Sequence, residues 1–402
     1  MARTVIVHVG APKTGTSFVQ DLLFSERDAL RKRGILYPAD RFDAHFLAAL
    51  DLMELPWGGI EREAGGAWDR LAAEIRAWDG TAIISHEILA TASRQQTARA
   101  LESLGGEGTE VHVVLSARDL VRQIPAEWQE NVKHRKTLPY GDFLDELRDP
   151  ARSTEVARWF WGVQEIPDVL DRWGSSLPPR QVHLVTVPPP GSPRDLLWQR
   201  FSSVLGLDPD ELTLDDSRAN VSLGVAEAAL LRRLNERLAD RVHNHNYRPL
   251  VRENLVHQHL SKERISDRLS VPDDVAAWAA DLSRRWVVEL AQRGYDVVGE
   301  LDDLLPQPAG AFSDPDDPDP AELAEAGLNA LTIMTVEAAR LRDHEQTLHR
   351  EIARLHGELD RAYATPLYRW RRKFVERSAS SPLARRLLGL YRRVRGRNSR
   401  ST

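Results

Sequence analysis

The chain contains no cysteine among its 402 residues. Disulfide bonds, thiolate metal sites and cysteine nucleophiles are therefore excluded, and the sequence suits a reducing compartment. No apolar run approaches the roughly 20 residues that a membrane-spanning helix needs. The N-terminal apolar run is also too short for the core of a secretory signal peptide. We therefore expect a cytoplasmic protein that is soluble or held peripherally on the inner face of a membrane.

Taken as a whole, the chain outside the C-terminal tail lacks an excess of positive over negative charge. The net charge is −6, but residues 364–402 carry twelve Arg or Lys against a single Glu376. The tail is thus +11, which leaves −17 on the rest of the chain. Its arginines alternate with aromatic and leucine side chains at roughly helical spacing, which is typical of a cationic amphipathic helix on an anionic membrane. A solvated disordered tail is the alternative, and we expect no nucleic acid partner because no recognition module is visible.

Four short β-branched runs predict strands at 4–9, 81–85, 110–117 and 181–187. They are almost continuously apolar, as parallel strands covered on both faces are. Helical patterns lie between and after them. These helices are predicted at 17–32, 66–78, 94–104 and 120–135. The alternation predicts an α/β domain with a doubly wound parallel sheet, which we expect to span residues 1–305.

A Pro- and Asp-rich stretch at 306–320 reads as an extended linker. Beyond it, residues 321–363 carry apolar side chains at alternating spacings of three and four, interrupted only by Glu345. This heptad pattern favours a coiled coil and hence a homodimer. A helix that folds back onto the α/β domain is the alternative.

The stretch "VHVGAPKTGTS" has the shape of a phosphate-binding loop between a strand and a helix. Gly10 and Gly15 keep the G-x-x-x-x-G spacing of ATP and GTP enzymes. In those enzymes a lysine follows the second glycine, whereas Thr16 stands there and Lys13 lies inside the turn. Asp119 is the only strand-end carboxylate that could support Mg²⁺. A nucleotide kinase or NTPase with a drifted loop is therefore the less favoured interpretation, and we expect no metal site.

The segment "PKTGTS" resembles the 5′-phosphosulfate loop of sulfotransferases that use 3′-phosphoadenosine 5′-phosphosulfate (PAPS). The resemblance implies a P-loop-like fold with PAPS as co-substrate. Lys13 would neutralise charge on the leaving phosphate, and the glycine and hydroxyl residues would donate hydrogen bonds to it. The residues that it assigns to PAPS binding in this loop are Pro12, Lys13, Thr14, Gly15, Thr16 and Ser17.

The segment "VVLSARDLVRQIPAEWQE" resembles the 3′-phosphate region of the same family. Arg118 matches the arginine that holds the 3′-phosphate, for which a guanidinium is well suited. The family has a serine eight residues later, but here Ala126 stands at that position. Arg122, Gln123 or Gln129 could compensate for the missing hydroxyl. This departure leaves a non-catalytic nucleotide-binding scaffold as another alternative for the chain. For Arg118 itself, the alternative is a purely structural role in an ion pair with Asp119.

Sulfuryl transfer to a hydroxyl group needs a base to take the proton. Related enzymes place a His or a Glu at the end of the strand beside the loop, and "AIISHEIL" offers both His86 and Glu87 there. Adjacent strand residues point to opposite faces, so only one of them can face the sulfur. The resemblance of this segment to carbohydrate-modifying members favours Glu87, with His86 as the alternative.

The acceptor is not readable from a motif. By resemblance we expect a carbohydrate or glycolipid of the cell surface, bound within residues 40–65 and 135–270. Two H-x-H pairs, at 243–245 and 257–259, could bind zinc if each shared one face of a strand. A polar or acceptor-binding segment is the favoured interpretation of these histidines.

Overall fold

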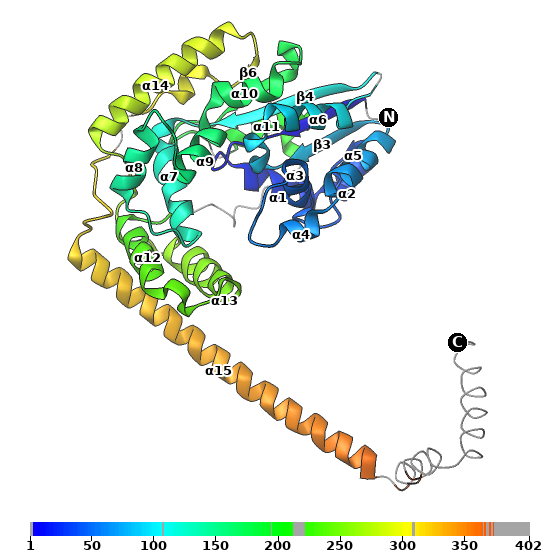
Figure 1. Cartoon of the computed structure of the whole chain (residues 1–402), viewed down its shortest axis with the longest axis vertical. Coiled ribbons are helices and arrows are strands. Elements are labelled where there is room, and N and C mark those ends of the chain that lie inside the picture. Colours follow the sequence, from blue (N-terminus) through cyan, green and yellow to red (C-terminus); the bar gives the residue numbers. More distant parts are fainter. Residues whose placement is uncertain are drawn as a thin grey trace, which may run out of the picture. The chain divides into compact units, whose positions relative to one another are not determined.

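The computed structural model describes residues 3–106, 108–193, 195–211, 222–307 and 310–364, with Pro366, Trp370 and Lys373 (Figure 1). Contacts divide the chain into two compact units, Met1–Ala330 and Leu331–Thr402. Apart from Ala364 and those three residues, the basic tail predicted at 364–402 lies outside the described residues.

Six parallel strands form a single sheet in the order β2-β3-β1-β4-β5-β6. The strands are β1 (Thr4–His8), β2 (Ile35–Leu36), β3 (Thr81–Ser85), β4 (Glu110–Ala117), β5 (Val182–Thr186) and β6 (Asp296–Val298). The predicted α/β class and parallel sheet are confirmed. The two strands that the sequence pattern missed, β2 and β6, lie at the edges of the sheet and have only two and three residues.

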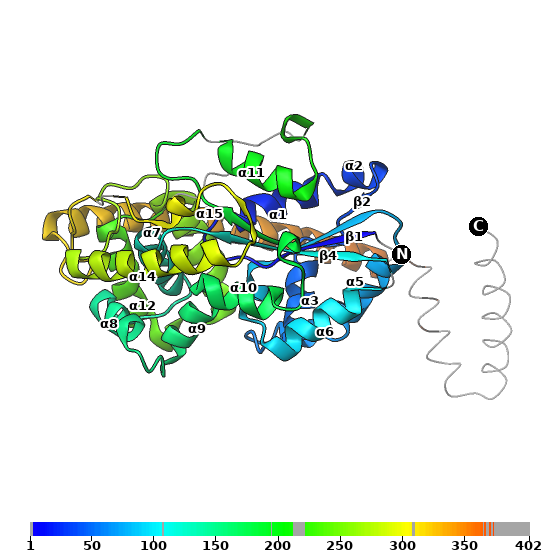
Figure 2. The same cartoon turned by 90° about the horizontal axis from the view of Figure 1, so that it is seen from above.

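Helices occupy both faces of the sheet, with α1, α2 and α11 on one side and α3, α5, α6 and α10 on the other (Figure 2). The α-helices of the first unit are α1 (Thr16–Ser25), α2 (Arg27–Lys32), α3 (Ala44–Met53), α4 (Glu61–Ala64), α5 (Ala67–Ala77), α6 (Arg94–Leu104), α7 (Leu120–Lys133), α8 (Tyr140–Arg148), α9 (Glu155–Gln164), α10 (Ile166–Gly174), α11 (Leu196–Leu205), α12 (Val225–Leu238), α13 (Asn244–Tyr247) and α14 (Asp273–Gln292). A 3₁₀ turn η1 (Glu87–Thr91) and a π-helix η6 (Arg248–Leu260) complete the elements used below.

Local sequence explains several helix boundaries. Ser93 and Gln96 form a capping box at the start of α6, and that helix spans the predicted residues 94–104. The helix predicted over 17–32 is two helices, because the chain leaves helical geometry at Glu26 between α1 and α2. Asp119 caps α7 by accepting from the backbone N–H of Arg122 at 3.0 Å.

The core on one face joins the sheet to α1 and α11. Ile6, Ile83 and Val114 come from three strands and are at most 4% exposed. Trp198 and Phe201 of α11 pack against them. Burying side chains of this size stabilises the fold by about 1.5–3 kcal/mol each. The strand ends that carry the predicted site are thus fixed on a rigid core.

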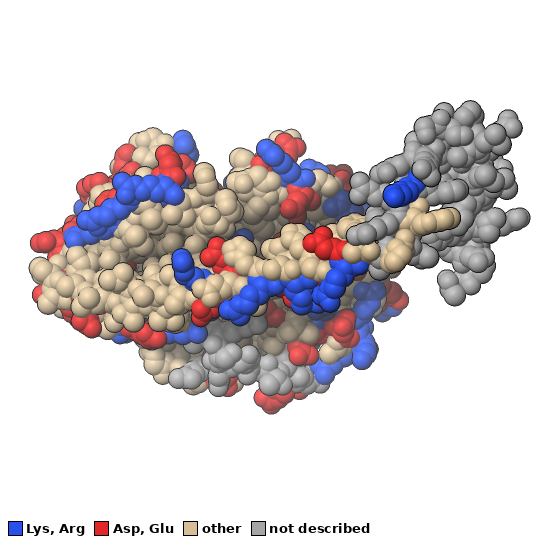
Figure 3. Space-filling model, turned by 90° about the horizontal axis from the view of Figure 1, so that it is seen from below, with Lys and Arg blue, Asp and Glu red and all other residues tan. Residues whose placement is uncertain are grey.

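The last helix, α15, runs from Pro320 to Ala364 and extends across the boundary between the two units. Among the described residues, no helix is both long enough and apolar enough to cross a bilayer. On the face drawn in Figure 3, acidic and basic side chains are interspersed among uncharged ones.

Candidate active site

The predicted site residues follow the carboxyl ends of β1, β3 and β4, which are neighbours at the centre of the sheet. The chain from β1 crosses first toward β2 and β3, and later to β4 on the other side of β1. Strand order therefore reverses at β1. Ligands of open α/β sheets bind outside the carboxyl ends of the strands at such a switch point.

The loop after β1 depends on two glycines. Gly10 has φ +116°, and a Cβ there would lie 3.0 Å from the Cα of Glu87. Gly15 has φ +91°, and a Cβ there would lie 2.6 Å from Leu197 of α11. Both positions therefore favour glycine for conformation, and Gly10 also does so for space, because it faces the backbone of Glu87. Through Gly10 the loop packs directly against the end of β3.

The amino end of α1 is suited to bind an anion. Its N-cap, Gly15, has no side chain to accept the first backbone N–H groups, and the first turn contains no acidic residue. Ser17 is exposed and Thr16 is buried. Neither hydroxyl makes a hydrogen bond to the residues that the structure describes. These free donors fit a phosphate or sulfate group.

Thr14 has a different role from its neighbours. Its side chain is 1% exposed, and its hydroxyl lies 2.6 Å from the carbonyl oxygen of Ala11 and 2.5 Å from Oγ of Ser116. Ser116 Oγ is in turn 2.9 Å from the carbonyl oxygen of Gly10. The Thr14 hydroxyl thus fixes the shape of the loop and points away from any ligand, which leaves its backbone N–H as the available donor.

The side chain of Lys13 extends from the loop to α7. Its Nζ donates to Oε2 of Glu130 at 2.5 Å, and its side chain is 33% exposed. Oε1 of Glu130 lies 3.1 Å from Nε2 of His134 and 3.6 Å from Arg252 of η6. Burial raises the pKa of Glu130, but His134, Lys13 and Lys133 outweigh it and hold that pKa well below its usual range. Glu130 is therefore an anion surrounded by cations.

His86 follows β3 directly and caps η1. Its Nδ1 accepts from the backbone N–H of Ile88 at 3.2 Å, so the neutral ring carries its proton on Nε2. Burial lowers the pKa of His86, and the negative charge of Glu87 only partly opposes this. At neutral pH the free nitrogen of His86 is thus a donor, which does not suit a base.

Glu87 is half-buried and begins η1. Its Oε2 accepts from Nε2 of Gln20 in α1 at 2.7 Å. Burial raises the pKa of Glu87, but His86, Gln20 and Lys13 together lower it below the usual value. Glu87 is therefore ionised at neutral pH and has lone pairs with which to accept a proton.

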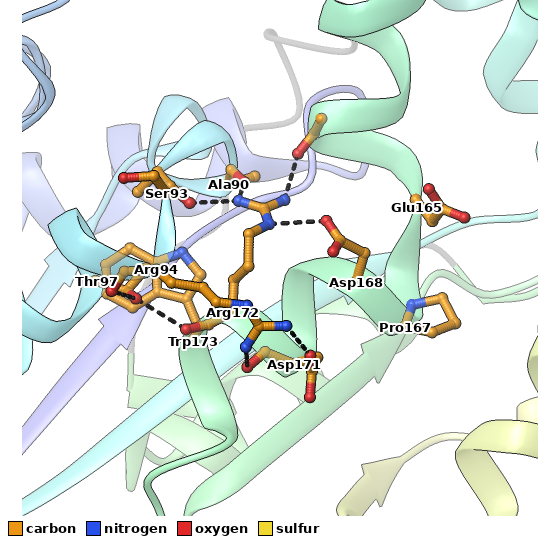
Figure 4. Close-up of polar contacts among 12 residues, drawn as sticks. Ala90, Ser93, Arg94, Thr97, Glu165, Pro167, Asp168, Asp171, Arg172 and Trp173 are labelled. Carbon is orange, nitrogen blue, oxygen red and sulfur yellow. Dashed lines mark hydrogen bonds and ion pairs between the residues drawn. The ribbon is translucent and has the colours of Figure 1, made fainter. Parts of the chain in front are cut away.

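The turn that begins with Glu87 is held by α10 (Figure 4). Arg172 Nη1 donates to the carbonyl oxygens of Ala90 and Ala92, and Trp173 Nε1 donates to that of Leu89 at 3.0 Å. These bonds fix the end of the turn to α10, and the carbonyl oxygen of Leu89 also accepts from the backbone N–H of Ala92 at 3.0 Å. No local sequence signal links Arg172 to this turn, so the sequence could not identify it as a supporting residue.

Arg118 follows β4 and is connected to the loop through one side chain. Its Nε donates to Oε1 of Gln123 at 2.9 Å, and Nε2 of Gln123 donates to the carbonyl oxygen of Pro12 at 2.7 Å. Its Nη2 donates to the carbonyl of Arg122, while its Nη1 makes no hydrogen bond within the described part of the chain. Burial and the charge of Arg122 lower the pKa of Arg118 to about 10, so it remains charged at neutral pH.

Asp119, Gln123 and Gln129 have different partners around Arg118. Asp119 pairs with Arg122 rather than with Arg118, and it caps α7 instead of facing the loop. Gln129 exchanges hydrogen bonds with both backbone groups of Leu223, so its amide is occupied. Gln123 is therefore the one glutamine that connects Arg118 to the loop, although Ala126 offers no hydroxyl.

The paired histidines do not share strand faces, because their segments are helical. His243 and His245 stack with ring centroids 5.7 Å apart at the start of α13, and His257 and His259 lie within η6. Among the described residues, no group of three or more His, Cys, Asp or Glu side chains could hold a metal ion.

Comparison with known proteins finds a similar solved structure but no relative by sequence. No protein-family model matches the chain, and no curated protein matches it in sequence. Among solved structures, the chain is similar to a sulfotransferase from Alicyclobacillus acidocaldarius. The sequence identity is 19% and the TM-score is 0.36, over 64% of this chain and 97% of that one.

Proposed function

We propose that this chain is a sulfotransferase that moves a sulfuryl group from PAPS to a hydroxyl group. One observation carries the proposal, namely the convergence of a lysine-bearing anion loop, an ionised carboxylate and a charged arginine at the ends of three adjacent strands. The resemblance of the same three segments to sulfotransferase motifs supports it.

The residues present fit this donor. The free N–H groups and hydroxyls at the start of α1 suit the 5′-phosphate, and the unbonded Nη1 of Arg118 suits the 3′-phosphate. When bound, PAPS supplies an activated sulfuryl group. Glu87 takes the proton of the acceptor hydroxyl as its oxygen attacks the sulfur, and Lys13 stabilises charge on the departing phosphate.

The kinase alternative is weaker on structural grounds. In ATP enzymes a lysine follows the second glycine of the loop, whereas Thr16 stands there. Asp119, the carboxylate that the sequence offered for a metal, is occupied as the cap of α7 and the partner of Arg122. The scaffold alternative rests on Ala126, which lacks the hydroxyl expected at that position. Arg118 nevertheless remains connected to the loop through the hydrogen bonds of Gln123.

We further propose that the acceptor is a carbohydrate or glycolipid destined for the cell surface. The enzyme would act in the cytoplasm at the inner face of the membrane, and its basic tail would bind anionic lipid. The strong positive charge of residues 364–402 supports this arrangement.

Titration of 3′-phosphoadenosine 5′-phosphate (PAP) into the protein without metal tests the proposal. We expect binding that Arg118→Ala weakens about 30-fold, because a charge-assisted contact contributes about 2 kcal/mol. Arg148→Ala is a matched control, since this arginine pairs with Asp274 on α14 and should leave the affinity unchanged. Binding of ATP with Mg²⁺ alone, or equal affinities in Arg118→Ala and wild type, would contradict the proposal.

A further inference from the structure

A row of aromatic rings leads away from the end of β3. Phe46 of α3 lies 5.1 Å from the ring of His86 and 5.6 Å from that of Trp57, measured between centroids. Trp57 lies 5.8 Å from Trp159 of α9. All four rings are half-buried, so each presents part of its surface to solvent. The row begins at His86, the residue before the proposed base, and continues through α3, the loop that follows it and α9.

The row ends at a carboxylate on α7. Trp159 Nε1 donates to Oε1 of Glu127 at 3.0 Å, while Oε2 has no hydrogen-bond partner among the described residues. Glu127 is 4% exposed, and an unsatisfied buried carboxylate oxygen is costly. Burial raises the pKa of Glu127, although the charge of Lys13 opposes this. Glu127 lies one helical turn before Glu130, and Glu130 accepts a hydrogen bond from Lys13 of the loop. The end of the row at Glu127 is therefore near the loop as well.

We propose that Phe46, Trp57, Trp159 and Glu127 form the acceptor subsite and that the acceptor is a sugar ring. This inference rests on the proposed function. Binding sites for small molecules combine apolar and aromatic surfaces with a few polar groups that fix orientation. The rings provide a surface for the apolar face of a sugar, and Glu127 provides an acceptor for one of its hydroxyls.

The presence of two carboxylates favours a sugar over a simple phenol as the acceptor. One acceptor hydroxyl gives its proton to Glu87, its oxygen bonds to sulfur, and the bond from sulfur to the phosphate oxygen breaks with the electron pair on that oxygen. A second hydroxyl is then needed for Glu127. A simple phenol has only the hydroxyl that reacts, whereas a sugar ring has several.

Sulfuryl transfer from labelled PAPS to defined acceptors tests the subsite. The sugar probes are the methyl glycosides of glucose, galactose, mannose and N-acetylglucosamine, with maltose, and 4-nitrophenol is the phenolic probe. We expect transfer to at least one sugar. Trp57→Ala and Trp159→Ala should each raise its KM roughly 2- to 12-fold, the range of one aromatic contact, with PAP affinity unchanged. Glu127→Gln should raise KM similarly, because the amide nitrogen cannot accept at that position.

Trp278→Ala is the matched control, because this half-buried tryptophan contacts Trp161 outside the row. It should leave KM unchanged. Transfer to 4-nitrophenol alone, transfer to no sugar, or equal KM values in all variants would overturn the subsite while PAP binding persists. Failure of the wild type to bind PAP would instead overturn the proposed function.

A second inference concerns α15 and is independent of the reaction. Its apolar row includes Leu341, Leu348, Ile352, Leu355 and Leu359, which are 41–50% exposed. These residues occupy the first and fourth positions of successive heptads that begin at Leu331, where the second unit also begins. A helix face of this kind is buried in a coiled coil.

The flanking charges favour a second copy of the same helix in parallel register. In a parallel pair, the residue before each first position faces the residue after the next fourth position of the partner. Glu337 then faces Arg342 of the other copy, whereas an antiparallel pair would place glutamates opposite glutamates. Exposed pairs of this kind contribute little affinity, but they select orientation. We infer that α15 forms a parallel two-stranded coiled coil in a homodimer.

Because the chain has no cysteine, one introduced thiol tests this register. Leu355→Cys should form a covalent dimer on mild oxidation, since equivalent residues of a parallel pair face each other near the end of the heptads. Arg350→Cys, on the outer face of the helix, should not. Light scattering of the unmodified full chain should give about twice the mass of 45.4 kDa. A monomeric mass, or equal cross-linking of both variants, would overturn the inference.

Discussion

Lys13→Met is expected to slow donor turnover by roughly 100- to 1000-fold, the loss typical of one donor that stabilises charge in the transition state. Charge on the leaving phosphate develops as the sulfuryl group departs, so Lys13 acts mainly on the rate. PAP affinity should change by less than about tenfold, because the helix end and Arg118 continue to hold the two phosphates. Single-turnover formation of PAP with enzyme in excess measures this rate.

The ion pair of Lys13 with Glu130 does not oppose this role. Both side chains keep some contact with solvent, at 33% and 19% exposure. A multiply charged donor phosphate can then replace Glu130 as the partner of Lys13. Glu130 also keeps His134 and Arg252 as partners after Lys13 leaves.

Lys136→Met is the matched control for Lys13→Met. Lys136 follows α7 and pairs with Glu155 at the surface, so its loss should leave turnover unchanged. A Lys13→Met enzyme that turns over within threefold of wild type would show that the lysine only balances Glu130.

The sequence predicted those parts of the fold that depend on local pattern. Continuous apolar runs identified the four longest strands, because parallel strands buried on both faces have that composition. The edge strands β2 and β6 were not predicted, since two or three residues are too few to show a period. The break at Glu26 was also missed, because the hydrophobic pattern continues through it.

The candidate site could be predicted by residue type but not by contact. The glycine spacing placed the loop, and the strand ends placed Glu87 and Arg118. The inward bond of Thr14 to Ser116 and the pairing of Lys13 with Glu130 join residues 102 and 117 positions apart. Pairings of this kind are created by the packing of β4 and α7 against the loop, and no local pattern contains them.

Glu87→Gln is expected to lower kcat by 10²–10⁴-fold, the range contributed by one general base. The amide keeps the shape of the carboxylate and can still accept from Gln20, so PAP affinity and folding should change little. The lowered pKa of Glu87 means that the carboxylate is already ionised at neutral pH. Activity of the wild type should therefore be flat with pH through neutrality and fall only in the acidic range where Glu87 gains a proton.

His86→Gln separates the two candidate bases. Because Nδ1 of His86 accepts from Ile88 and its other nitrogen carries the proton, the ring has no free lone pair for the acceptor. Its glutamine variant should lose less than tenfold in kcat, through a weaker cap on η1. If His86 were the base instead, His86→Gln would cause the larger loss, and wild-type activity would fall as the imidazole gained a proton. The order of the two losses thus assigns the proton acceptor at the end of β3.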